Sequence, residues 1–278
     1  MTELDVVYVW CGLPENKRCS YTKDLYYSIK SVRKNIENLR RIWIVVDDIV
    51  TESHVTQVGI DLDKNIRIVH YSKIIPKTYL PIYWNSNVIE SWIWKIRGLS
   101  DKFVYMCDDM YIGKRTTSDL FFHRGKPIIR INKGPPNHSL QSDKDVSLSD
   151  YVLMWRNAIK KHGINYTRLA HNAMPYRRSL MKKYYKEYKN EVHTASNNKV
   201  RQGKKDFNLL RFSGSLSVMK GDAILIATDA NTFDYFVESG DQYGIRKIKK
   251  LKPQFFCINN TNKNQKWVYN TLENYFSK

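Results

Sequence analysis

The first half of the chain alternates between short apolar runs and longer segments with apolar residues at helical spacing. Helical spacing recurs from Leu25 to Ile36 and from Asn85 to Ile96. Four apolar runs are short enough to be buried strands: Asp5–Trp10, Arg41–Asp48, Asn65–Tyr71 and Asp101–Gly113. This alternation predicts an α/β fold, in which a mainly parallel, Rossmann-like sheet carries helices on both faces.

The second half has a different pattern and predicts a mostly helical C-terminal half. Helices are expected near Asp150–His162, Pro175–Lys189, Phe207–Met219 and Gln265–Phe276, with one short strand at Gln254–Asn259. A stretch rich in Gly, Pro, Asn and Ser precedes them. We therefore divide the chain into an α/β half (1–131), a linker or insertion (132–147) and a helical half (148–278), which together form one continuous domain.

The chain carries a large net positive charge, which bears on the kind of partner it could bind. The chain has 278 residues, with 46 Lys and Arg against 27 Asp and Glu, a net charge of +19. Such a charge attracts polyanions such as nucleic acid, anionic lipid or phosphorylated sugars. A solvated, lysine-rich surface is the competing explanation.

Cysteine usage and hydropathy bear on the compartment. None of the four cysteines forms a C-x-x-C pair, so the simplest expectation is a reduced, cytoplasmic protein. A bridge between Cys11 and Cys19 would require an oxidising compartment. The first residues lack a signal-peptide pattern, and no apolar run approaches the roughly 18 residues that a membrane span needs. We therefore expect any membrane contact to be peripheral, at the inner face.

Two adjacent carboxylates form the sharpest local feature. Asp108 and Asp109 follow an apolar strand directly, and ligands of open α/β sheets bind outside the carboxyl ends of the strands. Such a pair could hold Mg²⁺ or Mn²⁺ against a diphosphate, or could accept a proton from a hydroxyl. A strand end that simply turns into solvent is the alternative, and Asp47 and Asp48 share the same local setting.

Polar residues also mark the start of the helix at residue 85. Asn85, Ser86, Asn87 and Glu90 lie there, and the spacing from Asn87 to Glu90 is that of a capping box. A purely structural cap therefore explains them. The functional alternative is that the helix N-terminus faces a phosphate group.

His171 is a candidate functional histidine because arginine residues flank it in the sequence. His171 lies between Arg168 and the pair Arg177–Arg178, a setting that suits an anionic substrate, so Arg178 is a candidate substrate contact. Arg201 lies in a basic polar stretch, and guanidinium groups match phosphate oxygens in bidentate fashion. Considered alone, Arg201 fits a solvated loop equally well. P-loop and dinucleotide-binding glycine motifs are absent from the sequence.

Four blocks, in order, resemble the Stealth family of sugar-1-phosphate transferases. DVVYVW looks like the family's DVVYTW, and KDLYYSIKSVRKNIENLRRIWIVVDD is similar to its next block. LPIYWNSNVIESWIWKIRGLSDKFVYMCDDMYIG resembles LPTFNSNAIE…IPGLSEHFIYLNDDMF with little interruption. The later segments AHNAMPYRRSLM, KVRQGKKDFNLL and KPQFFCIN match more weakly.

The resemblance implies an activity and assigns residues one at a time. A UDP-sugar such as UDP-GlcNAc would donate hexose-1-phosphate to a glycan or glycolipid hydroxyl in capsule or cell-surface polysaccharide synthesis, releasing UMP. Asp108, Asp109, His171 and Arg201 would be catalytic, with Mg²⁺ or Mn²⁺ on the two aspartates. Substrate contacts would come from the first-strand residues and from the helix start and its neighbours: Asp5, Trp10, Asn85, Ser86, Asn87, Glu90 and Arg178.

The sequence departs from the family pattern at two points that bear on the metal. The Asn before the Asp pair is Cys107 here, and the terminal Asn-Asp is Asn259-Asn260. Two other functions stay open. A GT-A-like glycosyltransferase would use the same donor but release UDP, and a module that binds nucleic acid or anionic membranes would explain the charge. Nucleic acid is the less favoured partner, because that module leaves the clustered carboxylates unexplained; the oligomeric state is open.

Overall fold

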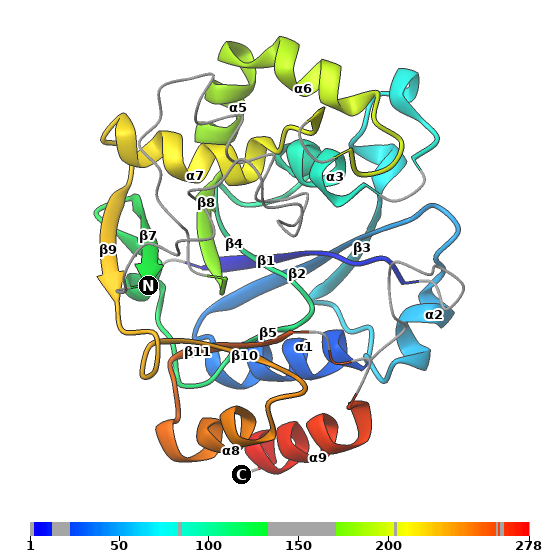
Figure 1. Ribbon diagram of the computed structural model, residues 1–278. Coiled ribbons are helices and arrows are strands. Elements are labelled where there is room, and N and C mark those ends of the chain that lie inside the picture. Colours follow the sequence, from blue (N-terminus) through cyan, green and yellow to red (C-terminus); the bar gives the residue numbers. More distant parts are fainter. Residues whose placement is uncertain are drawn as a thin grey trace, which may run out of the picture.

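A five-stranded sheet forms the centre of the molecule (Figure 1). The computed structural model describes residues 3–12, 23–82, 85–132, 171–202, 205–259, 261 and 264–277. The strand order is β3-β2-β1-β4-β8, in which the first four strands are parallel and β8 is antiparallel to β4. These strands are β1 (Leu4–Val9), β2 (Leu39–Val46), β3 (Ile66–His70), β4 (Lys102–Met106) and β8 (Met174–Arg177). The predicted mainly parallel α/β fold is confirmed.

Helices cover both faces of this sheet, as predicted (Figure 1). Side chains alternate along each strand, so Val7 packs into the core on one face while Val6 and Tyr8 pack into the core on the other. The first face carries α3 (Ser86–Trp92), α5 (Arg178–Glu187), α6 (Lys189–Ser196) and α7 (Leu209–Met219). The opposite side carries α1 (Asp24–Asn35), α8 (Gln242–Leu251) and α9 (Gln265–Phe276), with the short α2 (Glu52–Gln57) near the margin.

Two smaller sheets join segments that lie far apart in the sequence. One has the order β10-β11-β5, from β10 (Asp234–Glu238), β11 (Phe255–Asn259) and β5 (Met110–Ile112). The other has the order β6-β7-β9, from β6 (Phe122–His123), β7 (Lys126–Asn132) and β9 (Ile224–Thr228). The C-terminal half thus contributes strands as well as helices, and β11 was the one that the sequence predicted.

Two predicted elements need correction. The run Asp101–Gly113 is not one strand: β4 ends at Met106, and the chain turns through the two aspartates before β5 begins at Met110. The predicted helix at Pro175 begins as strand β8, and its helix starts only at Arg178. Proline is tolerated there because β8 is the edge strand of the sheet.

Some predictions fall on residues outside the described part of the chain. They include the helix at Asp150–His162 and nearly all of the linker, and the division into halves stays a prediction. Cys11 is disulfide-bonded, so the reduced state expected for it is wrong; Cys19, named as an alternative partner, lies outside the described residues. Cys107 and Cys257 are free thiols. No helix in the described ranges has the length and apolar character needed to cross a membrane.

Candidate active site

The antiparallel pairing of β8 with β4 creates the candidate site. Tyr105 on β4 pairs with Met174 on β8, so the residues that follow Tyr105 and those that precede Met174 meet at the carboxyl edge of the sheet. Asp109 and His171 are brought together in this way, with 3.9 Å between Asp109 Oδ2 and His171 Nε2. Their side chains are 17% and 41% exposed, which leaves the pair open to a ligand.

Asp109 has one carboxylate oxygen that accepts a hydrogen bond and one that has no partner within the described part of the chain. Oδ2 accepts a hydrogen bond from the Cys257 thiol at 3.4 Å, and the backbone carbonyl accepts from Ile258 N at 3.1 Å. Oδ1 is buried and has no hydrogen-bond partner among the described residues. A buried carboxylate oxygen without a donor is costly, so this atom is suited to a cation or a substrate hydroxyl.

Asp108 differs from Asp109 in its electrostatic surroundings. Burial, the neighbouring Asp109 and the nearby Asp24 raise the pKa of Asp108 to about 8. Asp24 begins α1 and accepts hydrogen bonds from Tyr111 and Thr261, so a third carboxylate lies behind the pair. Clustered carboxylates of this kind are stabilised by a bound cation, which lowers their pKa values.

The residues at this edge fit a divalent metal ion. Cys107, Asp109 and His171 offer ligand atoms that all lie within 4.8 Å of one another. Asp108, expected as the second metal carboxylate, is not part of this group. Carboxylate and imidazole suit Mn²⁺, whereas Mg²⁺ prefers oxygen ligands alone. A metal held by Asp109 and His171 would neutralise charge on a diphosphate.

The start of α3 is capped differently from the prediction. Asn85 is the N-cap, and its side-chain oxygen accepts from Asn87 N at 3.1 Å. Asn87 and Glu90 direct their side chains toward other elements, so the predicted capping box is wrong. The reason is that the polar residues of α3 are buried against α7 and its preceding loop.

Asp206, which the sequence analysis missed, joins this helix start to the loop that carries Arg201. Its buried carboxylate accepts from four donors at 2.9–3.3 Å: the side chains of Asn85, Asn87 and Asn198 and the backbone N–H of Gln202. The Arg201 guanidinium donates to Ser86 Oγ and is otherwise exposed. Arg201, Ser86 and the N-terminus of α3 are therefore held together by one anchored loop.

We expect the substitution Asp206→Asn to destabilise the protein. Asparagine keeps the size but turns one acceptor into a donor that faces other donors, which costs about 1–3 kcal/mol for a buried group. Urea unfolding measures the change. Asp61→Asn, at an exposed position, is the matched control and should change stability by less than about 0.5 kcal/mol. Equal effects at both positions would contradict the anchoring role.

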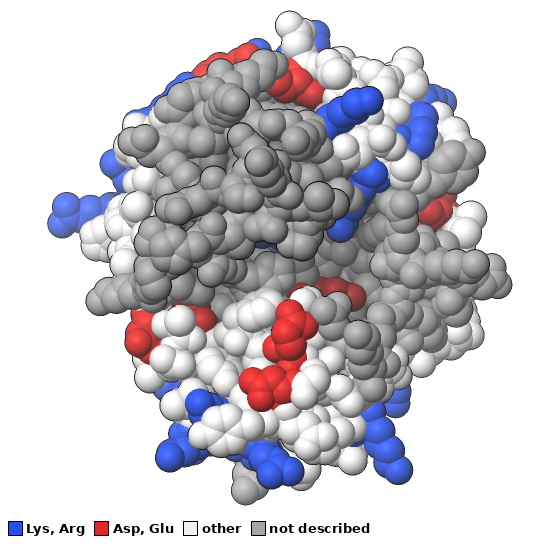
Figure 2. Space-filling view, viewed as in Figure 1, with Lys and Arg blue, Asp and Glu red and all other residues white. Residues whose placement is uncertain are grey.

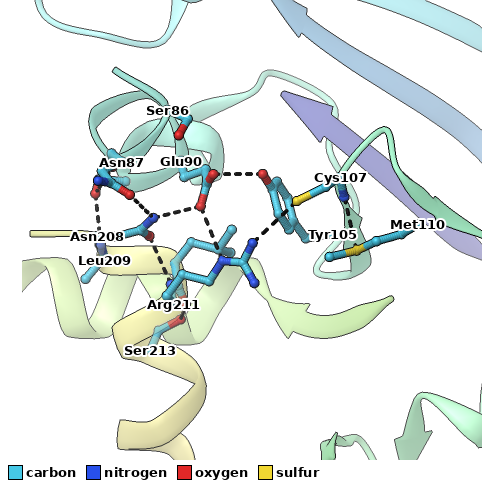
Figure 3. Close-up of polar contacts among 12 residues, drawn as sticks. Ser86, Asn87, Glu90, Tyr105, Cys107, Met110, Asn208, Leu209, Arg211 and Ser213 are labelled. Atoms are coloured by element: carbon cyan, nitrogen blue, oxygen red, sulfur yellow. Dashed lines mark hydrogen bonds and ion pairs between the residues drawn. The ribbon is translucent and has the colours of Figure 1, made fainter. Parts of the chain in front are cut away.

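Glu90 connects α3 to the sheet and to α7 (Figure 3). Glu90 accepts from the Tyr105 hydroxyl at 2.8 Å and from Asn208 Nδ2 at 2.7 Å, and it pairs with Arg211 at 3.4 Å. Arg211 also donates to Cys107 Sγ at 3.5 Å. The network therefore reaches from the start of α3 to the Cys107–Asp109–His171 group, and it is nearly fully buried. Arg211 was detectable as a single charge within an apolar helical run.

Asp5 and Trp10 lie in the core. Asp5 is fully buried at the start of β1, where it pairs with Arg40 and accepts from Trp43 Nε1 and Ser100 N at 2.9 Å. It is about 13 Å from the carboxyl end of β1, at 3.3 Å per strand residue, so its expected substrate contact is corrected to a structural role. Trp10 is 2% exposed and packs among the core residues on the α1 side.

Arg177 and Arg178 also lie away from His171. Because residues 174–177 form a strand, the two arginines lie at the end of β8 opposite to His171. Arg177 pairs with Asp101 at 2.8 Å, and Arg178 donates to the carbonyls of Trp94 and Leu99. The expected substrate contact of Arg178 is therefore corrected to bracing of the chain after α3, and Arg168 lies outside the described residues.

Figure 2 shows how acidic and basic side chains are distributed on one face of the molecule. Acidic side chains gather in the lower middle of the face shown in Figure 2, and several Lys and Arg side chains lie toward its edge. Among the residues drawn in colour, the basic side chains of this face form no continuous stripe of the kind that follows a nucleic-acid backbone.

Comparison with known proteins supports the family resemblance seen in the sequence. Residues 18–129 match the family model described as Stealth protein CR2, conserved region 2. The chain is 28% identical to capsular polysaccharide phosphotransferase fcs1 of Haemophilus influenzae, over 94% of this chain and 73% of that protein. The resemblance to the Stealth family is thereby confirmed.

Other comparisons agree with the Stealth assignment. A capsular polysaccharide phosphotransferase of Neisseria meningitidis serogroup B is 28% identical, over 89% of this chain and 67% of that protein. Because these relatives are named phosphotransferases, the expectation of an enzyme of this class is confirmed. Among solved structures, the galactosyltransferase LgtC superimposes with a TM-score of 0.49 at 11% identity, over 98% of this chain and 95% of that chain, a likeness too weak to build on.

Proposed function

We propose that this enzyme transfers a sugar-1-phosphate from a UDP-sugar to a hydroxyl group of a glycan acceptor in polysaccharide synthesis. The observation that carries the proposal is the meeting of Asp109 and His171 at the carboxyl edge of the sheet, with Asp108 directly before Asp109 in the chain. Open α/β sheets bind their ligands at this edge. The names of the two relatives described above, both capsular polysaccharide phosphotransferases, support the same reaction class.

The chemistry divides among few residues. The acceptor oxygen attacks the phosphorus that bears the sugar, the bond from that phosphorus to the oxygen bridging the two phosphates breaks, and UMP leaves with the bridging oxygen. The hydroxyl proton passes to His171 when no ion occupies it, and otherwise to Asp108, which directly precedes Asp109 in the chain. Phosphoryl transfer depends mainly on positioning and charge neutralisation. A divalent ion at Asp109 and His171 would supply part of that neutralisation.

Arg201, held at the start of α3, is the proposed phosphate contact. Its guanidinium is exposed, and its hydrogen bond to Ser86 Oγ holds it at the start of α3. Planar guanidinium groups bind phosphate oxygens in bidentate fashion. The anchored loop through Asp206 limits the conformational entropy lost when Arg201 binds an anion.

The proposal is tested by identifying which product carries the β-phosphate of the donor. We expect a UDP-sugar labelled at the β-phosphate to deliver the label to the glycan, with UMP as the second product and a new phosphodiester signal in phosphorus NMR. A panel of UDP-sugars and glycan acceptors, with Mg²⁺ or Mn²⁺, covers the open choice of substrate. Heat-inactivated enzyme is the control.

Labelled UDP would mean that the anomeric carbon is attacked instead, as in an ordinary glycosyltransferase. That outcome would overturn the proposed reaction while leaving the site in place. Strong, salt-dependent binding of single-stranded nucleic acid without turnover of any donor would favour the binding-module alternative.

A further inference from the structure

The candidate site contains a sulfur ligand as well as oxygen and nitrogen. Cys107 is the first residue after β4, and it is a free thiol. Its Sγ lies within 4.8 Å of the ligand atoms of Asp109 and His171. All three side chains are partly exposed, so an ion can reach them from solvent. The Stealth pattern to which the sequence was compared has asparagine at this position, so Cys107 departs from it.

Two contacts place the sulfur within the group. Arg211 donates to Cys107 Sγ at 3.5 Å, while Cys107 N donates to Met110 Sδ at 3.2 Å (Figure 3). These contacts hold the residue from both its backbone and its side chain. The positive charge of Arg211 is balanced by Glu90 at 3.4 Å, which limits its repulsion of a cation.

Asp109 supplies an independent indication of a ligand. Its Oδ1 is buried, faces no donor within the described ranges and belongs to the same carboxylate that lies 3.9 Å from His171 Nε2. A buried carboxylate oxygen without a donor is unfavourable in a folded protein unless a ligand satisfies it. The three-residue group and this unsatisfied atom therefore point to the same place.

We propose that Cys107, Asp109 and His171 bind a borderline-soft divalent ion of the Zn²⁺ class, with a fourth position open to a phosphate oxygen of the substrate. Three protein ligands and one open position are typical of catalytic zinc sites. Thiolate and imidazole favour such ions over Mg²⁺, which prefers oxygen. Ligand atoms at about 2.0–2.3 Å from one ion lie roughly 3.3–3.7 Å apart, so the group must close by about 1 Å, which side-chain rotation can supply.

Cobalt binding tests the ligand set directly. Co²⁺ reports a thiolate ligand through a charge-transfer band in the near ultraviolet, and tetrahedral geometry through intense visible bands. We expect the wild-type protein to show both bands with one equivalent of Co²⁺, and added Zn²⁺ to remove them. A wild-type protein that binds Co²⁺ without the charge-transfer band, or that binds none, overturns the proposal.

Variants identify which thiol is responsible. Cys107→Asn restores the family's residue and should abolish the charge-transfer band and weaken Zn²⁺ binding at least ~10-fold, the loss already seen when outer-shell partners are removed. Mg²⁺ binding should not weaken. Cys257→Ala removes the other described free thiol and should retain the band. Loss of the band in Cys257→Ala but not in Cys107→Asn would contradict the assignment.

The inference rests on the proposed function only for the role of the open position, because metal binding requires no turnover. If the cobalt spectrum is as expected but labelled UDP is the product, the proposed reaction is refuted and the proposed metal site is supported. If the labelled phosphate is transferred to the glycan but the thiolate band is absent, the proposed metal site is refuted and the proposed reaction is supported. The two failures are therefore distinguishable.

Discussion

Asp109→Asn should lower kcat at least about 100-fold, the scale on which general acid–base and charge-stabilising groups act. The substitution keeps the size of the side chain and removes the negative charge that faces His171 at 3.9 Å. It also replaces the carboxylate oxygen that has no described hydrogen-bond partner. Both the metal and the phosphate chemistry proposed for this edge depend on that charge. Steady-state transfer of the labelled β-phosphate measures the change.

Asp48→Asn is the matched control. Asp48 also belongs to an Asp pair after an apolar strand, but it lies beyond β2, is exposed and accepts from Ser72 Oγ at 2.6 Å. We expect its kcat to stay within about 3-fold of wild type, because exposed substitutions outside a site have small effects. Comparable losses in both variants would show that the transfer does not depend on the meeting of β4 and β8. Unfolding curves for each variant separate lost chemistry from lost structure.

Arg130→Met should reduce the free energy of unfolding by about 3–5 kcal/mol, because it leaves a buried charge without its partner. Arg130 and Asp234 have no exposed side-chain area and lie 3.7 Å apart. Burial is the main cause that lowers the pKa of Arg130 and raises that of Asp234, and each charge partly offsets the shift of the other. Removing the cation leaves Asp234 with its hydrogen bonds from Thr228 and Asn172 alone.

Packing of the Arg130 side chain adds to the expected loss of stability and connects Arg130 to the candidate active site. The Arg130 guanidinium stacks over Phe255 at 4.5 Å and donates to the carbonyl groups of Leu120 and Ala173. Ala173 and Asn172 directly follow His171, so the pair fixes the segment that presents the histidine. We therefore expect the transfer rate of Arg130→Met to fall even under conditions where the protein stays folded.

Chemical denaturation with two comparison variants measures the Arg130 effect. Arg33→Met breaks a surface pair with Asp63, in which both side chains are at least one-third exposed, and should cost less than about 1 kcal/mol. The double variant Arg130→Met/Asp234→Asn should be less destabilised than the sum of its single variants, because neither charge is then left unpaired. A loss below about 1 kcal/mol for Arg130→Met would refute the structural role of the buried pair.

Local pattern was sufficient for most of the parallel strands and for the carboxylate half of the site. Short apolar runs and helical spacing predicted β1, β2, β3, α1 and α9 to within a few residues, because both periods are properties of the local sequence. The same pattern placed Asp108 and Asp109 at a strand end. The long third block, NSNVIE to CDDMYIG, carried the Stealth resemblance that the comparisons confirm.

Only the tertiary structure decided which polar residues meet. His171 reaches Asp109 because β8 runs antiparallel to β4, and no local pattern predicts a strand that begins with Met-Pro and pairs 70 residues away. The partners of Asp206, Arg211 and Arg130 are identified only after α3, α7 and β7 pack. Conversely, Asp5 and Arg178 looked like substrate contacts until packing supplied each with partners inside the protein. Strand periodicity is local, whereas the partner of a buried charge is chosen by the fold, because burying it alone would cost too much.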